Sequence, residues 1–116
     1  MEKRFWFAIG GVNGLVAVIM GAVAAHFIAD AHAAELADKA SLYQLIHAVA
    51  LTAIADRAGK CFAAARWLFL AGILFFCGAL YFKALACLPV AGLAPIGGIA
   101  LMAAWVSVAL AACKKA

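Results

Sequence analysis

Hydrophobic residues run through this chain in four long stretches, and nearly every charged residue lies in the short segments between them. The stretches cover residues 5–28, 42–55, 67–85 and 94–112. A soluble protein of 116 residues has a small interior and needs a largely polar surface, yet hydrophobic residues make up 71% of this chain and charged residues only 12%. We therefore predict an all-α, polytopic membrane protein: a single domain over residues 1–116 in which four transmembrane helices form a compact bundle.

The first stretch also has features of a secretory signal peptide. Lys3 and Arg4 precede an apolar run, and residues 31–33 (Ala-His-Ala) resemble a cleavage site. The apolar run exceeds twenty residues, which is longer than a usual signal-peptide core, and further apolar stretches follow it. We therefore expect this stretch to remain as an uncleaved transmembrane helix.

The second stretch is the weakest of the four. Its apolar part is shorter than the ~20 residues that a straight crossing needs, and it contains Tyr43, Gln44, His47 and Thr52. Neighbouring helices must therefore shield its polar side. In the preceding segment, residues 30–41, alanine and leucine recur at helical spacing between charged residues, which predicts a short helix lying at the membrane interface.

The distribution of lysine and arginine indicates the orientation. If the N-terminus is cytoplasmic, the outer segments hold only Lys39 and Lys83. The inner segments then hold the other seven basic residues: Lys3, Arg4, Arg57, Lys60, Arg66, Lys114 and Lys115. By the positive-inside rule, both termini are expected in the cytoplasm.

Small residues on the stretches predict close helix packing. Leucine is no more apolar than a lipid tail, so membrane helices associate through close backbone approach rather than through leucine burial. The predicted packing glycines are Gly10, Gly14, Gly21, Gly72, Gly78, Gly97 and Gly98. Their pattern fits contacts within one chain and contacts between chains equally.

Four polar side chains define a candidate ligand site near the outer face: His26, His47, Gln44 and Tyr81. Gln44 lies one helical turn before His47, and both histidines and Tyr81 are expected at similar depth. Two neutral imidazoles could bind zinc, copper or haem iron, or could relay protons. The structural alternative is a hydrogen-bonded network that fixes the second helix against the first, and we favour it because two histidines are too few ligands for a closed metal site. Accordingly we expect no bound metal and no cofactor.

The chain lacks the patterns of the common catalytic sites. It contains no Gly-x-Ser-x-Gly, no His-Glu-x-x-His and no phosphate-binding loop, so we expect no catalytic residues and no enzyme activity. Its four cysteines form no Cys-x-x-Cys pair. The net charge of +4 comes from residues at the ends of the apolar stretches rather than from a basic stripe, so nucleic acid is not an expected partner.

Taken in order, four segments of the chain resemble one family, the YgdD-like family. This is domain-of-unknown-function family 423, which includes the eukaryotic transmembrane protein 256. The resemblance rests on these segments: GAVAAH from Gly21, YQLIHAVAL from Tyr43, LFLAGILFFCGALY from Leu68 and APIGGIALMAAW from Ala94. Together they cover nearly the whole chain.

The resemblance implies a small four-helix protein of the bacterial inner membrane and implies no particular activity. The family's histidines correspond to His26 and His47, its Tyr-Gln pair to residues 43–44, and its glycine-rich segment to residues 95–98. This chain has Ala24 where the family leads us to expect glycine, and alanine or cysteine replaces the expected serines at positions 77 and 79. Those replacements make a polar site on the third helix less favourable.

The leading functional hypothesis is a non-enzymatic helical module in the lipid bilayer that interacts with itself, as a homo-oligomer, or with another membrane component. The alternative is a transporter or carrier of a small solute, a proton or a metal, which would use the polar site near the outer face.

Overall fold

The computed structural model describes residues 2–86 and 91–113, and the described part is built from helices without strands. The elements in chain order are α1 (Glu2–His26), α2 (Ala31–Ile54), α3 (Lys60–Gly72), the π-helical turn η1 (Ile73–Cys77), α4 (Gly78–Ala86), the 3₁₀ turn η2 (Ala91–Leu93) and α5 (Ala94–Ala111). Since α3, η1 and α4 follow one another without a break, the described chain forms four long rods.

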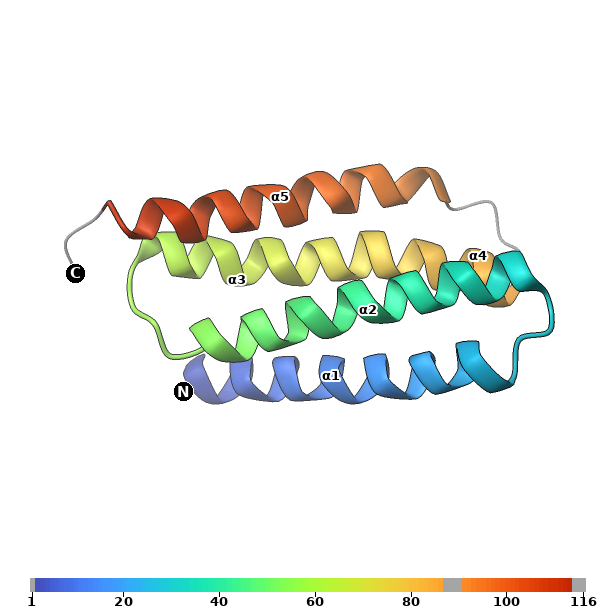
Figure 1. The fold of residues 1–116 in the computed structure, drawn as a ribbon. Helices are drawn as coiled ribbons and strands as arrows, with labels where there is room; N and C mark the ends of the chain where they lie inside the picture. Colours follow the sequence, from blue (N-terminus) through green and yellow to red (C-terminus); the bar gives the residue numbers. More distant parts are fainter. Residues whose placement is uncertain (1, 87–90, 114–116) are drawn as a thin grey trace.

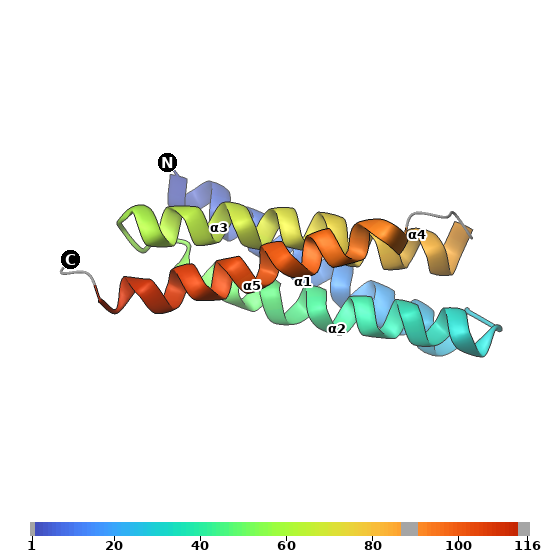
Figure 2. The same ribbon diagram turned by 90° about the horizontal axis from the view of Figure 1, so that it is seen from above.

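The four rods lie lengthwise beside one another (Figure 1). α1 packs against α2, α2 packs against η1 and α4, and α5 packs against α3 and η1. The rod formed by α3, η1 and α4 therefore contacts both α2 and α5. In the view from above, the ends of α1 and α5 that lead to the two chain termini again lie at the same end of the bundle, as in the first view (Figure 2). The core contains Trp6, Leu51, Phe69 and Cys77 as its largest fully buried side chains.

The second rod differs from the sequence-based expectation. We expected an interfacial helix at residues 30–41 and a separate span at residues 42–55, whereas residues 31–54 form one continuous helix. Asp30 caps it, because its carboxylate accepts a 2.8 Å hydrogen bond from the backbone N–H of Ala33. No glycine or proline follows before Ile54, and so nothing in the backbone interrupts the helix between the charged and the apolar half.

Two helices make their closest approach at Gly97. A Cβ atom at this position would lie 2.8 Å from the backbone carbonyl carbon of Phe75, in the π-helical turn η1. The adjoining rod has Gly72, whose added Cβ would meet the side chain of Leu101 and would lie 3.1 Å from the Gly97 carbonyl oxygen. Only glycine at both positions allows α5 to rest on the α3–η1 backbone, as expected for small-residue packing in membranes.

The other predicted packing glycines divide into close and open positions. At Gly10, an added Cβ would lie 2.5 Å from the Thr52 side chain and 3.2 Å from the Ala48 carbonyl oxygen, so α1 and α2 approach closely there. An added Cβ at Gly21 would lie 3.2 Å from the Ser41 hydroxyl oxygen, which is closer than ordinary packing. An added Cβ at Gly14 would lie 4.0 Å from the Ala48 side chain, which is ordinary clearance. Gly98 also has ordinary clearance, and the space beside Gly78 is open to 4 Å. Among the described residues, Gly78 therefore makes no close contact with a neighbouring helix.

Within residues 2–86 and 91–113, three helices are long and apolar enough to cross a membrane: Lys3–His26, Lys60–Ala86 and Ala94–Ala111. Their outward faces carry large exposed hydrophobic side chains, among them Val18 on α1, Leu74 on η1 and Met102 on α5. α2 is equally long but carries Glu35, Asp38 and Lys39 in its first half.

Candidate functional site

A chain of hydrogen bonds links three helices in the interior. The Tyr81 hydroxyl on α4 donates to Oε1 of Gln44 on α2 at 2.7 Å. Nε2 of Gln44 donates in turn to Oδ1 of Asn13 on α1 at 3.0 Å, and Nδ2 of Asn13 donates to the Ile9 carbonyl within α1 at 2.8 Å. The bond between Gln44 and Asn13 joins α2 to α1, and each of these two amides has a donor role and an acceptor role filled inside the protein.

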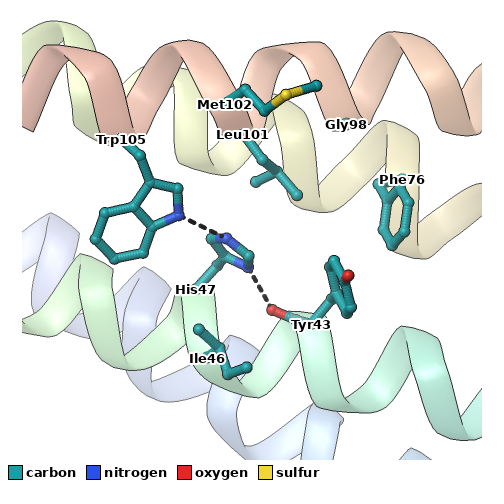
Figure 3. A pocket seen from close by; sticks show the side chains of 8 residues that line it. All are labelled: Tyr43, Ile46, His47, Phe76, Gly98, Leu101, Met102 and Trp105. Atoms are coloured by element: carbon teal, nitrogen blue, oxygen red, sulfur yellow. Dashed lines mark hydrogen bonds between the residues drawn. The ribbon is translucent and has the colours of Figure 1, made fainter.

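His47 is held by a second set of bonds on another side of α2. It is 5% exposed. Its Nε2 accepts the indole N–H of Trp105 on α5 at 3.1 Å, and its Nδ1 lies 2.6 Å from the Tyr43 carbonyl oxygen (Figure 3). A ring that accepts at Nε2 and faces a carbonyl at Nδ1 is neutral with its proton on Nδ1. Both nitrogens are therefore engaged, and neither presents a free lone pair to a metal ion.

The four residues of the predicted site do not form one cluster. Gln44 and Tyr81 are hydrogen-bonded to each other, and His47 follows Gln44 one turn later but bonds to α5. His26 is exposed at the end of α1, next to Phe27, and none of the hydrogen bonds of the described residues joins it to the other three. The described residues also contain no group of three His, Cys, Asp or Glu side chains placed to hold a metal ion.

A groove with a volume of about 470 Å³ opens between α2 and α5, above the η1 turn. It is lined by eight residues: Tyr43, Ile46, His47, Phe76, Gly98, Leu101, Met102 and Trp105 (Figure 3). The lining is mostly apolar and rich in aromatic rings. We name it the α2–α5 groove. The sequence did not predict this groove, because its walls come from three separate elements, α2, η1 and α5. The signal that the sequence does contain is the presence of Trp105 and Tyr43, two amphipathic aromatic side chains within apolar stretches.

Arg66 is a second feature that the sequence pattern did not reveal. It is 6% exposed, although its place at the start of an apolar stretch suggested a basic residue at the membrane surface. Its Nη1 donates to the carbonyl oxygens of Ile54 and Arg57, both at 2.9 Å, at the end of α2. Its guanidinium carbon lies 5.9 Å from the centre of the Trp6 ring. Arg66 thus adds a side-chain donor at the end of α2, where the Ile54 carbonyl also accepts the backbone N–H of Arg57 at 3.1 Å. Its charge complements the negative end of the helix dipole.

Two further hydroxyl groups, on Thr52 and Ser107, and three thiols belong to the described residues. Thr52 bonds back to the Val49 carbonyl at 2.8 Å, as expected for a threonine inside a helix. Ser107 instead donates across to the Cys61 carbonyl on α3 at 2.6 Å. Cys61, Cys77 and Cys113 are free thiols. None of these groups lies in an arrangement of nucleophile and base.

These features define the class of the protein: a small all-helical protein whose apolar helices are compatible with a membrane protein, with hydrogen-bonded polar side chains inside and an aromatic groove between two helices. The sequence of residues 20–98 matches the family described as "protein of unknown function (DUF423)". The chain belongs to the DUF423 family. Searches among curated proteins and among solved structures gave no match.

Proposed function

We propose that this protein is a non-enzymatic, four-span module of the bacterial inner membrane that binds another membrane component in the α2–α5 groove. One observation carries the proposal: Asn13, Gln44 and His47 are bonded to protein groups, whereas the groove is open and mostly apolar. A reaction centre would need polar groups presented to a substrate. A recognition site inside a bilayer needs an apolar hollow with few polar groups, which is what the groove offers.

The length of α2 supports its assignment as the fourth span. Its 24 residues extend roughly 36 Å at ~1.5 Å per residue, which exceeds the ~30 Å thickness of the hydrocarbon layer. α2 lies alongside α1 for most of its length (Figure 1). A membrane that surrounds α1 therefore surrounds α2 as well, and the charged residues 35–39 lie toward the end at which α1 finishes and α2 begins.

The charges at the two ends of the bundle support cytoplasmic termini. One end carries the start of α1 and the α2–α3 connection, where Lys3, Arg4, Arg57 and Lys60 lie. The opposite end carries the α1–α2 connection with Asp30, and the nearby acidic residues of α2. The positive-inside rule then places the first end in the cytoplasm. Lys114 and Lys115, which add to the count from the sequence, lie outside the described residues.

Topology reporters test the membrane arrangement. Fusions at the N-terminus, at residue 58, at residue 29 and at the C-terminus should report cytoplasm, cytoplasm, periplasm and cytoplasm. If the reporter at residue 58 lies on the opposite side from the N-terminus, α2 does not complete a second crossing and the four-span proposal is wrong.

Photocrosslinking in native membranes tests the binding role. A photoreactive residue at Met102 in the groove should give a specific adduct with a membrane component. The matched control is Val18 on α1, because the two side chains are similarly exposed, at 64% and 62%. The same adducts at the same yield from both positions would contradict a binding site in the groove.

A carrier of a small solute, proton or metal is the second candidate. It is favoured by the line of Asn13, Gln44 and Tyr81, which crosses three helices. Proteoliposomes should then show uptake that Gln44→Leu abolishes. Uptake indistinguishable from that of protein-free liposomes removes this candidate.

A further inference from the structure

The hydroxyl of Tyr43 marks a hydrogen-bonding position in the α2–α5 groove. The Tyr43 ring stacks on Phe76, with centroids 4.8 Å apart and planes at 28°. Its backbone carbonyl faces His47, but none of the hydrogen bonds among the described residues involves its hydroxyl. A phenolic hydroxyl in hydrocarbon is costly without a partner. The side chain is 40% exposed, so a ligand in the groove can reach it.

The depth of Tyr43 restricts what that partner can be. Tyr43 is one turn, about 6 Å, after Lys39 on α2, and the helix continues roughly 17 Å beyond Tyr43 without a charged residue. The headgroups of phospholipids lie at the membrane surfaces, beyond the ends of a ~30 Å hydrocarbon layer. A ligand that lies in the groove beside this uncharged half of α2 and accepts a hydrogen bond from Tyr43 must therefore combine a mostly apolar body with a hydrogen-bond acceptor.

The walls of the groove favour a flat ring. Trp105 forms one wall, where its indole is held by the bond to His47 and by an edge-on contact with Phe69 at 4.9 Å. Tyr43 and Phe76 form a stacked pair on the other side. Gly98 lines the space between them without a side chain. Aromatic walls of this kind recognise another aromatic or conjugated ring by stacking and edge contacts.

We propose that the α2–α5 groove binds a membrane-soluble quinone, with a ring carbonyl accepting a hydrogen bond from the Tyr43 hydroxyl and the ring lying against Trp105 and Phe76. Quinones combine a flat ring, carbonyl acceptors and a long apolar chain, and they reside within the hydrocarbon layer. The inference deepens the proposed function, on which it rests for the placement of α2 in the membrane. It concerns binding alone and includes no electron transfer.

Saturable quenching of tryptophan fluorescence tests the inference. The probe is a benzoquinone with a decyl chain, titrated into purified, detergent-solubilised protein. Wild-type protein should show saturable quenching at one probe per chain. Tyr43→Phe should weaken binding roughly fivefold to tenfold through loss of one hydrogen bond in an apolar site.

A pair of glycine variants separates binding in the groove from partition into the micelle. Gly98→Leu should remove the saturable component, because the new side chain occupies the groove, while an added Cβ meets only Phe76 at 3.9 Å. Gly11→Leu is the matched control, since Gly11 is exposed on α1 with nothing within 4 Å of the added Cβ. It should bind the probe as wild type does.

Three outcomes would overturn the inference: quenching that is unsaturable and equal in all variants, wild-type binding by Gly98→Leu, or wild-type affinity of Tyr43→Phe. Competition by decane at the same concentration as the probe would also overturn it, because the occupant would then be a plain hydrocarbon chain. The titration does not depend on orientation in a membrane. Its failure therefore leaves the topology proposal intact, whereas failed topology reporters leave the binding result standing.

Discussion

Trp105 on α5 donates its indole N–H to Nε2 of His47 on α2, and this 3.1 Å bond joins two helices on either side of an open groove. α5 packs mainly on α3 and η1 rather than on α2. The bond therefore fixes the width of the groove at one end, and it also determines the tautomer of His47. Trp105 and His47 thus hold α5 and α2 together and also form part of the wall of the α2–α5 groove.

His47 on α2 and His26 on α1 should differ sharply in their effect on stability. His47→Phe removes both hydrogen bonds and leaves the Trp105 N–H without its acceptor, so we expect the free energy of unfolding to fall by about 1–2 kcal/mol. The matched variant His26→Phe changes an exposed ring and should alter it by less than about 0.5 kcal/mol. Thermal unfolding in detergent measures both. Equal losses would show that the bonds of His47 contribute nothing.

Gln44 and Tyr81 should be energetically coupled. Gln44→Leu and Tyr81→Phe each break the 2.7 Å bond between them, so the double variant should lose less stability than the sum of the single variants. We expect a coupling energy on the order of 0.6–1 kcal/mol, typical of interhelical hydrogen bonds in membranes. Unfolding in mixed micelles with increasing SDS measures the cycle. Strict additivity would contradict the bond.

Adjacent glycines on α5 provide a matched test of helix packing. Gly97→Ala places a methyl group against the backbone of η1, so we expect a loss of about 1–3 kcal/mol despite the higher helix propensity of alanine. Gly98→Ala places it at ordinary contact distance from Phe76 and should be nearly neutral. Thermal unfolding of the two variants compares them directly. A neutral Gly97→Ala would mean that α5 does not rest on the η1 backbone.

Arg66 should hold the end of α2 in place. Arg66→Met leaves the carbonyl groups of Ile54 and Arg57 without their side-chain donor, and we expect faster amide hydrogen exchange in residues 55–59 with a stability loss of about 1–3 kcal/mol. Lys60→Met is the control, because Lys60 is exposed at the start of α3, directly after the same connection. If the two variants exchange alike, the cap has no effect on this segment.

The helical class and the presence of helices long and apolar enough to cross a membrane were predictable, because they follow from composition and from the length of apolar runs, which need no knowledge of neighbours. The need of Asn13 for a partner on another helix was predictable for a similar reason: a primary amide in hydrocarbon must be satisfied. Its partner was not, since Gln44 lies 31 positions away and only helix rotation determines which polar residues face each other.

We expected one helix to end and another to begin at residue 42, because the chain changes there from charged to apolar residues. A helix ends, however, only where its backbone hydrogen bonding is interrupted. The chain from Ala31 to Ile54 has a cap at its start and nothing that interrupts it. The π-helical turn was equally hidden, because its residues, Ile73–Cys77, read as an ordinary apolar stretch. It occurs where the backbone of α5 reaches η1 at Gly97.

The sequence by itself determined three properties of this protein. It has apolar runs of membrane length, basic residues gathered at the ends of those runs, and small residues that allow close helix contact. These are local properties, read from neighbouring positions along the chain. The tertiary structure decided which polar groups meet. It divided the expected single site into an Asn13–Gln44–Tyr81 chain and a His47–Trp105 pair, and it left His26 apart. Hydrogen bonds require atoms within about 3 Å, and that proximity arises only from the rotation and crossing of packed helices.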